Sequence, residues 1–173
     1  DKLTWEPHID TLTKRCQKDL QILQHLTGTT WGADQQTLLL FYKALIRSRL
    51  EYGCQVFNSA SDRLLRKLDG IQYTALKICT GALTNTSLEE LQILAGDLPL
   101  QLRRDEHILR YAIRNSCLHA ENPTRAAFRA CDRAFYTKMV PKPPACRTAF
   151  LLQRKLNLPT IEAEQRMCDP SPW

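Results

Sequence analysis

Apolar residues recur at helical spacing over the first two-thirds of the chain. Between residues 6 and 26 they follow steps of three and four, at Ile9, Leu12, Cys16, Leu20, Leu23 and Leu26. This spacing is typical of an amphipathic helix. Pro7 is compatible with the first turn of such a helix, and Thr27 with Gly28 ends the pattern. The sequence therefore predicts one long helix over residues 6–26.

Capping residues mark the start of two further helices. Asp34 precedes a second apolar pattern that runs to about Leu50, and Ser61 precedes a third that Gly81 closes. The apolar positions of these two patterns are Leu38, Phe41, Tyr42, Leu45, Ile46, Leu64, Leu68, Ile71, Ala75 and Ile78. Both helices are predicted to turn these side chains toward a common core.

Two shorter patterns complete the helical part. Ser87 and Glu90 have the spacing of a capping box, so a fourth helix is predicted to begin there and to stop at Gly96. Pro99 is predicted to open a fifth helix that continues to about Leu118. No series of alternating apolar and polar residues indicates a strand. The prediction for residues 1–118 is an all-α fold, an irregular bundle of about five helices.

The last third of the chain has a different composition. Seven of the nine prolines follow Glu121, and the apolar periodicity weakens there. Residues 119–173 are therefore predicted to form a linker-like, partly disordered basic tail, with one short helix over residues 148–156. We expect the boundary between the helical domain and this tail after residue 118.

Large apolar and aromatic residues on these patterns are the expected core. The aromatic side chains among them could also stack on nucleic-acid bases, an alternative that the sequence leaves open beside the packing role. The residues predicted to form the core are Trp5, Leu12, Leu23, Trp31, Leu38, Tyr42, Leu45, Leu68 and Ile71.

Cysteine usage indicates a reducing environment. Seven cysteines are scattered along the chain, at Cys16, Cys54, Cys79, Cys117, Cys131, Cys146 and Cys168. Their number is odd and none is in a Cys-x-x-Cys pair, so neither a disulfide framework nor a zinc site is predicted. The sequence shows no secretion signal and no run of about 20 apolar residues that could span a membrane. We expect an intracellular protein with free thiols and no membrane contact, in either the nucleus or the cytoplasm.

Motifs of enzyme active sites are missing from the sequence. There is no glycine-rich phosphate loop, no Gly-x-Ser-x-Gly, no His-Glu-x-x-His and no Asp-Asp pair. His8 and Asp10 are two residues apart, so they point in different directions on a helix. Catalysis by this chain alone is not expected, and no metal site or cofactor is predicted within it.

The net charge of +6 comes almost entirely from the tail. Residues 1–122 hold fifteen Lys and Arg against fourteen Asp and Glu, whereas residues 123–173 hold nine against four. A basic patch on the helical part must therefore arise from the placement of cations on one face of a helix.

Cations do recur at helical spacing opposite the apolar positions. Lys and Arg on rigid helices can neutralise successive phosphates of a nucleic acid. Charged stripes are also the ordinary wet face of amphipathic helices, and Glu106 with Arg110 has the spacing of a common surface ion pair. On the third helix, Arg63, Lys67 and Lys77 lie away from the apolar face, and Arg66 flanks them. The residues predicted to bind nucleic acid are Lys14, Arg15, Lys18, Lys43, Arg47, Arg49, Arg103, Arg110 and Arg114.

Five short motifs follow one another in a characteristic order. They are LTWEPHID at Leu3–Asp10, TGTTWGAD at Thr27–Asp34, LFYKALIRSRLEYGCQVF at Leu40–Phe57, LRKLDGIQYTALKICTGAL at Leu65–Leu83 and LEELQILAGDLPLQLRR at Leu88–Arg104. In this order and with these gaps, they resemble the reverse transcriptase of non-LTR (LINE, jockey-like) retrotransposons. The similar segment lies just C-terminal to the polymerase palm, and the resemblance covers residues 1–118.

This resemblance implies a place within a larger protein. In the family, an L-T-W-x-x-H-I string follows the strand that closes the palm, so Leu3–Ile9 would begin the helical thumb. The chain would then be the thumb and connection of a transposable element's RNA-directed DNA polymerase, and its partner would be the RNA–DNA template–primer hybrid. The catalytic aspartates, and the Mg²⁺ that the parent polymerase would use, would belong to the missing palm and fingers.

One motif departs from the family pattern. Where relatives read Arg-Thr-(Ser/Thr)-Pro before the fourth helix, this chain has Thr84-Asn85-Thr86-Ser87. Ser87 still caps the helix, but the family's Arg is absent as a phosphate ligand. Two other functions stay open: a decayed or domesticated transposon fragment that acts as a protein-interaction module, and a relic with no selected function.

Overall fold

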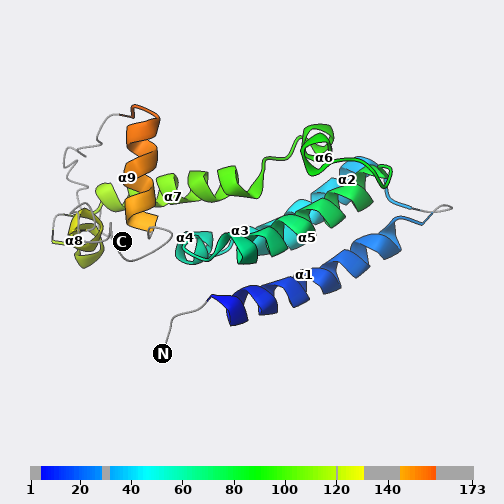
Figure 1. The fold of residues 1–173 in the computed structure, drawn as a ribbon, viewed down its shortest axis with the longest axis horizontal. Helices are drawn as coiled ribbons and strands as arrows, with labels where there is room; N and C mark the ends of the chain where they lie inside the picture. The colour runs from blue at the N-terminus through cyan, green and yellow to red at the C-terminus, as the bar shows by residue number, and fades with distance from the viewer. Residues whose placement is uncertain (1–4, 29–31, 120, 131–144, 159–173) are drawn as a thin grey trace, which may run out of the picture. The chain divides into compact units, whose positions relative to one another are not determined.

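The computed structural model describes residues 5–28, 32–119, 121–130 and 145–158 of the chain. Every regular element within these ranges is a helix, and none of these residues lies in a strand (Figure 1). The predicted all-α class is therefore confirmed. The chain divides into two compact units, Asp1–Arg104 and Asp105–Trp173. This division falls earlier than the boundary expected after residue 118.

The first helix, α1 (Glu6–Leu26), has the bounds that its apolar spacing predicts. Ile9, Cys16 and Leu23 are fully buried, so the predicted apolar face is the packed face. At the N-terminal end, the indole Nε1 of Trp5 donates a 3.0 Å hydrogen bond to the Ser59 hydroxyl. This bond ties the start of α1 to a segment 54 residues further along the chain.

The second predicted helix is present but irregular. It consists of α2 (Gln35–Phe41), a π-helical stretch η1 (Tyr42–Arg47) and α3 (Ser48–Glu51). The Asp34 carboxylate caps its start by accepting hydrogen bonds from the backbone N–H groups of Gln36 and Thr37. A π-helical turn is wider than an α-helical one and shifts the register of the residues that follow. Apolar spacing alone does not predict this stretch.

A left-handed glycine interrupts the chain after α3. Gly53 has φ 68° and separates α3 from the one-turn helix α4 (Cys54–Phe57), which the sequence did not indicate. Glycine takes this conformation without the Cβ clash that other residues meet. Cys54 and Phe57 are buried, so α4 contributes to the core although it is only one turn long.

The next two helices begin and end at the predicted caps. Helix α5 (Asp62–Thr80) follows Ser61 and ends at Gly81, which has φ 63°. Helix α6 (Leu88–Ala95) begins with the predicted capping box, in which the Ser87 hydroxyl accepts from the backbone of Glu90 and the Glu90 carboxylate accepts from the backbone of Ser87. Capping residues therefore mark these boundaries, although the Ser61 side chain makes no capping hydrogen bond.

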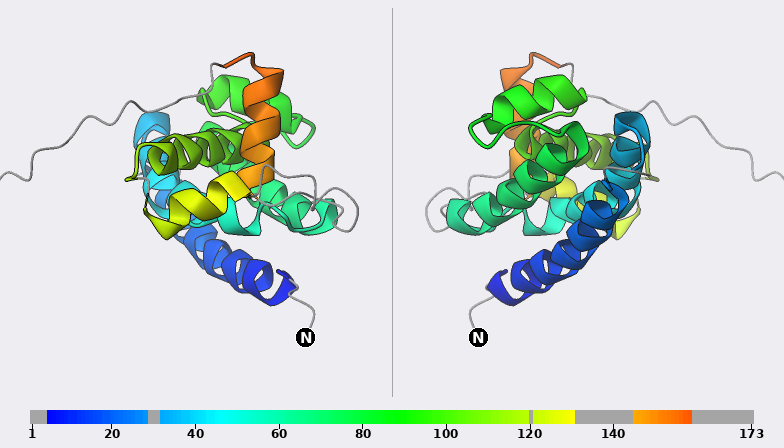
Figure 2. Two further views of the ribbon diagram at one scale, coloured as in Figure 1. Left: turned by 90° about the vertical axis from the view of Figure 1, so that its left-hand side faces the viewer. Right: turned by 90° about the vertical axis from the view of Figure 1, so that its right-hand side faces the viewer.

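Helices α1 and α5 lie side by side and run in the same direction (Figures 1 and 2). The Trp5 to Ser59 hydrogen bond and an ion pair between Asp10 and Lys67 join their N-terminal halves in matching order. The run from α2 to α3 packs against both helices in the opposite direction. Three helical segments thus enclose the main apolar core of the first unit.

Most of the expected core residues lie in this packed interior. Leu23, Leu38, Tyr42, Leu68 and Ile71 are buried in the main cluster. The half-buried side chains of the remaining expected residues, Trp5, Leu12 and Leu45, pack against it. Trp31 lies outside the described residues.

Helix α7 (Leu100–Ser116) spans the division between the two units. The second unit also contains α8 (Pro123–Ala130) and α9 (Ala145–Lys155). Its small core contains the buried Ile108, Ala112 and Ala149. Helix α9 overlaps the short helix predicted over residues 148–156, and α8 was not predicted. Much of the tail for which disorder was expected, residues 131–144 and 159–173, lies outside the described residues.

Candidate nucleic-acid interface

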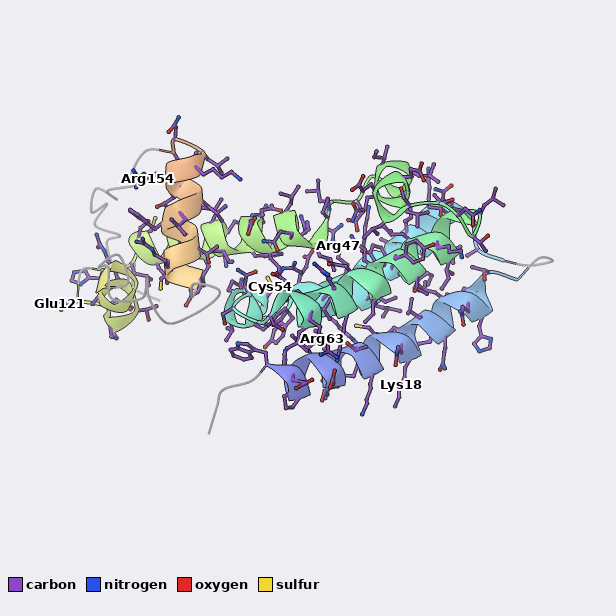
Figure 3. All side chains as sticks on the ribbon, in the orientation of Figure 1. Lys18, Arg47, Cys54, Arg63, Glu121 and Arg154 are labelled. Atoms are coloured by element: carbon purple, nitrogen blue, oxygen red, sulfur yellow. The ribbon has the colours of Figure 1, made fainter. Side chains whose placement is uncertain are left out.

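Three of the predicted nucleic-acid-binding residues stand on the outer face of α1. Lys14, Arg15 and Lys18 are exposed. Cys16, which lies among them in the sequence, and Leu20, which follows them, are buried. In Figure 3, Lys18 extends from α1 on the side away from the other helices. Among the residues that the structure describes, these three cations have no ion-pair partner. Their charge is therefore available to an external anion.

Two other predicted residues are held by internal carboxylates. Arg47 lies 3.0 Å from Oε1 of Glu51 through Nε and 2.9 Å from Oδ1 of Asp97 through Nη1. Arg103 forms a bidentate pair with Glu51, with Nε 2.7 Å from Oε1 and Nη2 3.0 Å from Oε2. Both side chains are largely buried, with 22% and 17% of their surface exposed. Charge-assisted bonds of this kind orient the guanidinium groups inward.

The carboxylate of Asp97 is the centre of a buried polar network. It accepts hydrogen bonds from the Tyr42 hydroxyl at 2.7 Å and from Nε2 of Gln72 at 3.0 Å. Gln72 in turn accepts a 2.9 Å bond from Nε2 of Gln92. Burial, and the neighbouring negative charge of Asp97, raise the pKa of Tyr42, so its hydroxyl remains a donor. This network has no signal in the sequence, because its members lie on separate elements.

Arg49 forms a third internal pair, with the buried Asp19 of α1. Nη1 of Arg49 lies 2.8 Å from Oδ2 of Asp19. Burial raises the pKa of Asp19, and the Arg49 guanidinium opposes that shift. This ion pair joins α3 to α1 and engages a cation that was predicted to bind nucleic acid.

The remaining predicted residues are exposed on η1 and α7. Lys43 is exposed on η1. Arg110 and Arg114 are exposed on α7, and Nη2 of Arg110 lies 2.6 Å from Oε1 of Glu106, four residues earlier. The i,i+4 pair considered from the sequence is therefore present.

Helix α5 adds cations that were noted in the sequence but not assigned to binding. Arg63 and Arg66 are exposed on its outer face, and Figure 3 places Arg63 beside α1. Nζ of Lys67 lies 2.7 Å from Oδ1 of Asp10, so this residue bridges the two helices. Nζ of Lys77 lies 5.9 Å from the centre of the Tyr73 ring, within the range of a cation–π contact. Exposed cations therefore lie on both α1 and α5, and the Asp10–Lys67 ion pair joins the two helices.

Metal-ligating groups and pockets are the other places where a chemical site could lie. The described residues contain no group of three His, Cys, Asp or Glu side chains that could hold a metal ion. An open depression of about 280 Å³ lies where α1 and α5 end and α2 begins, and no charged side chain lines it. None of the described helices is long and apolar enough to cross a membrane.

No protein-family model, curated protein or solved structure matches this chain. Any assignment of function therefore depends on the sequence motifs and on the chemistry of the surface formed by α1 and α5.

Proposed function

We propose that this chain is the helical thumb and connection of a non-LTR retrotransposon reverse transcriptase, and that it grips the RNA–DNA template–primer hybrid. The order of the five sequence motifs supports this assignment. The chain performs no bond chemistry in this proposal. The palm and fingers of the parent protein supply the catalytic aspartates and hold Mg²⁺.

The exposed cations of α1 carry the proposal. Lys14 and Lys18 are one helical turn apart and Arg15 flanks them, so they can meet successive phosphates of one strand. The buried face of α1 fixes the helix against the core, which keeps these side chains on one surface. A rigid row of cations suits a ligand that is recognised by its backbone geometry and charge.

Salt-dependent binding of the full chain to a hybrid tests this function. The probe is a fluorescent 16-base-pair RNA–DNA hybrid, and anisotropy is followed from low to moderate salt. If about four to six phosphates are neutralised, log affinity falls with log salt at a slope of roughly −3 to −5. A flat dependence would contradict the proposal.

Charge reversal on α1 identifies the surface. The double variant Lys14→Glu/Lys18→Glu should weaken binding and make the slope shallower by about 2 units, because two phosphate contacts are lost. The matched control is Arg154→Glu/Lys155→Glu, since these residues are exposed at the end of α9. Circular dichroism should show the same helix content for all three chains. An equal loss of affinity in the control would show only a dependence on net charge.

The interaction-module alternative rests on a different observation. Helix α6 exposes Ile93 and Leu94, with 82% and 58% of their surface accessible, and exposed apolar side chains are typical of protein contacts. If the chain is a protein-interaction module, neither the wild-type chain nor the Lys14→Glu/Lys18→Glu variant binds the hybrid. An Ile93→Asp/Leu94→Asp variant, compared by crosslinking with the wild-type chain, would lose the protein contact.

A further inference from the structure

Gly70 occupies an unusual position at the middle of α5. It is exposed on the outer face of the helix, and its φ is outside the left-handed region found at Gly53, Gly81 and Gly96. A Cβ added to Gly70 meets no atom within 4 Å. A glycine inside a helix destabilises it by about 1 kcal/mol relative to alanine. Neither backbone conformation nor packing among the described residues accounts for this glycine.

Cations flank Gly70 at helical spacing. Arg63 and Lys77 are each seven residues from it, two turns in either direction, and so share its face. Arg66 and Thr74 are each one turn away, and the Thr74 hydroxyl donates a 3.0 Å hydrogen bond to the Gly70 carbonyl instead of projecting outward. The centre of the face is therefore bare backbone between positively charged ends. Arg63 and Lys77 are separated by roughly 21 Å of helix.

The neighbouring helix completes the surface. The Asp10–Lys67 ion pair holds the outer edge of α1 against the outer edge of α5. The opposite charges of this ion pair cancel each other. Rows of cations lie on both helices, Lys14 and Lys18 on α1 and Arg63 and Arg66 on α5. Two rows of cations on joined helices offer contacts to both phosphate strands of a duplex, whereas a single strand could use only one row.

We propose that the phosphodiester backbone of a bound RNA–DNA hybrid makes its closest approach to this chain at Gly70. One strand lies along Arg63, Arg66 and Lys77 of α5, and the other along Lys14 and Lys18 of α1. Glycine is required because a side chain at position 70 would hold the backbone away from the flanking cations. This inference rests on the proposed thumb function and assigns its duplex contact to a specific face.

Substitutions at Gly70 separate binding from folding. Gly70→Ala should make the folded state of the full chain roughly fivefold more favourable in urea unfolding, since alanine is the better helix former. Gly70→Gln should weaken binding of the 16-base-pair hybrid by about tenfold or more, because the longer side chain occupies the contact. The salt slope of Gly70→Gln should become shallower although no cation is removed, because the longer side chain holds the phosphates away from the flanking cations. Ala126→Gln, at an exposed position of α8, is the control for added bulk and should bind as the wild type does.

A second variant tests the flanking cations. Arg63→Gln/Arg66→Gln should reduce the magnitude of the salt slope by about 2 units and leave helix content unchanged. Single-stranded RNA of the same length should bind more weakly than the hybrid. Tight binding to single strands, or to phosphatidylserine vesicles in place of the hybrid, would overturn the inference.

The results also distinguish the contact at Gly70 from the proposed thumb function on which it rests. A wild-type chain that does not bind the hybrid overturns both. If the Lys14→Glu/Lys18→Glu variant loses affinity while Gly70→Gln and Arg63→Gln/Arg66→Gln bind as the wild type does, the thumb function survives and the contact at Gly70 is wrong. Loss of affinity in all three supports the assigned face.

Discussion

The hydroxyl of Tyr42 donates a 2.7 Å hydrogen bond to Oδ2 of Asp97 across 55 residues of sequence. The Asp97 side chain is only 1% exposed, and it also accepts from Arg47 and Gln72. Arg47 and Tyr42 belong to η1, Gln72 belongs to α5, and Asp97 follows α6. One buried carboxylate therefore joins three parts of the first unit.

Removal of the Tyr42 hydroxyl should weaken this junction. In Tyr42→Phe the ring still fills the core, but Asp97 loses one of its buried donors, so the free energy of unfolding should fall by about 1–2 kcal/mol. Urea unfolding measures the loss. The control is Tyr52→Phe, because Tyr52 is 84% exposed and should tolerate the same change. Equal stability of Tyr42→Phe and the wild type would contradict a stabilising role for the bond.

Local signals predict much of this fold. Apolar spacing predicted the bounds of α1, and the caps at Ser61, Gly81 and Ser87 predicted those of α5 and the start of α6. The π-helical stretch and α4 were not predicted, because they depend on the widened turn and on the left-handed Gly53. The pairing of Tyr42 with Asp97 has no local signal, since it forms only when distant segments meet.

Tertiary contacts also limit what the sequence predicts about the cations. Exposure of Lys14 and Lys18 follows from their position opposite the apolar face of α1. Lys43 and Arg47 repeat the spacing of Lys14 and Lys18 in the sequence, and Arg49 follows. Tertiary contacts with Asp97 and Asp19 nevertheless engage Arg47 and Arg49. Helical periodicity predicts which face a residue occupies and not which neighbour faces it.

The carboxylate of Glu51 should matter for stability and not for hybrid binding. It pairs with Arg47 and Arg103, and its side chain is 15% exposed. Glu51→Gln removes the charge that holds both arginines, so the free energy of unfolding should fall by about 1–3 kcal/mol. Hybrid affinity measured by anisotropy should not fall, because the cations of α1 are unaffected. Glu121→Gln is the control, since Glu121 is exposed in the second unit.

Thiol reactivity should separate the cysteines by burial. Burial raises the pKa values of Cys16, Cys54 and Cys79 to about 11 each, so few of these thiols are ionised at neutral pH. Among the cysteines that the structure describes, iodoacetamide at pH 8 should label the exposed Cys117 first. The three buried thiols should react only after unfolding in urea, as peptide mass spectrometry would show. Rapid labelling of Cys16 in the native chain would contradict the packing of α1.

Two aspartates should contribute to stability with opposite dependence on pH. Burial raises the pKa of Asp19 in the folded chain, with Arg49 opposing, whereas a hydrogen bond from the Thr37 side chain lowers that of Asp34. The Asp19 contribution is therefore fully present below the unfolded value of 3.8 and is lost as pH rises through the folded pKa. The Asp34 contribution is present above 3.8 and is lost as pH falls through its lowered pKa.

Urea unfolding of Asp19→Asn and Asp34→Asn between pH 3 and pH 7 measures these two contributions. As pH rises above 3.8, the wild type should lose stability relative to Asp19→Asn. As pH falls below 3.8, it should lose stability relative to Asp34→Asn. Each variant serves as the control for the other, because both exchange one carboxylate for an amide of the same shape. If wild-type stability changed with pH in the same direction relative to both variants, the ion pair with Arg49, and not burial, would dominate at Asp19. The packed face of α1 would then be more polar than its apolar spacing indicates.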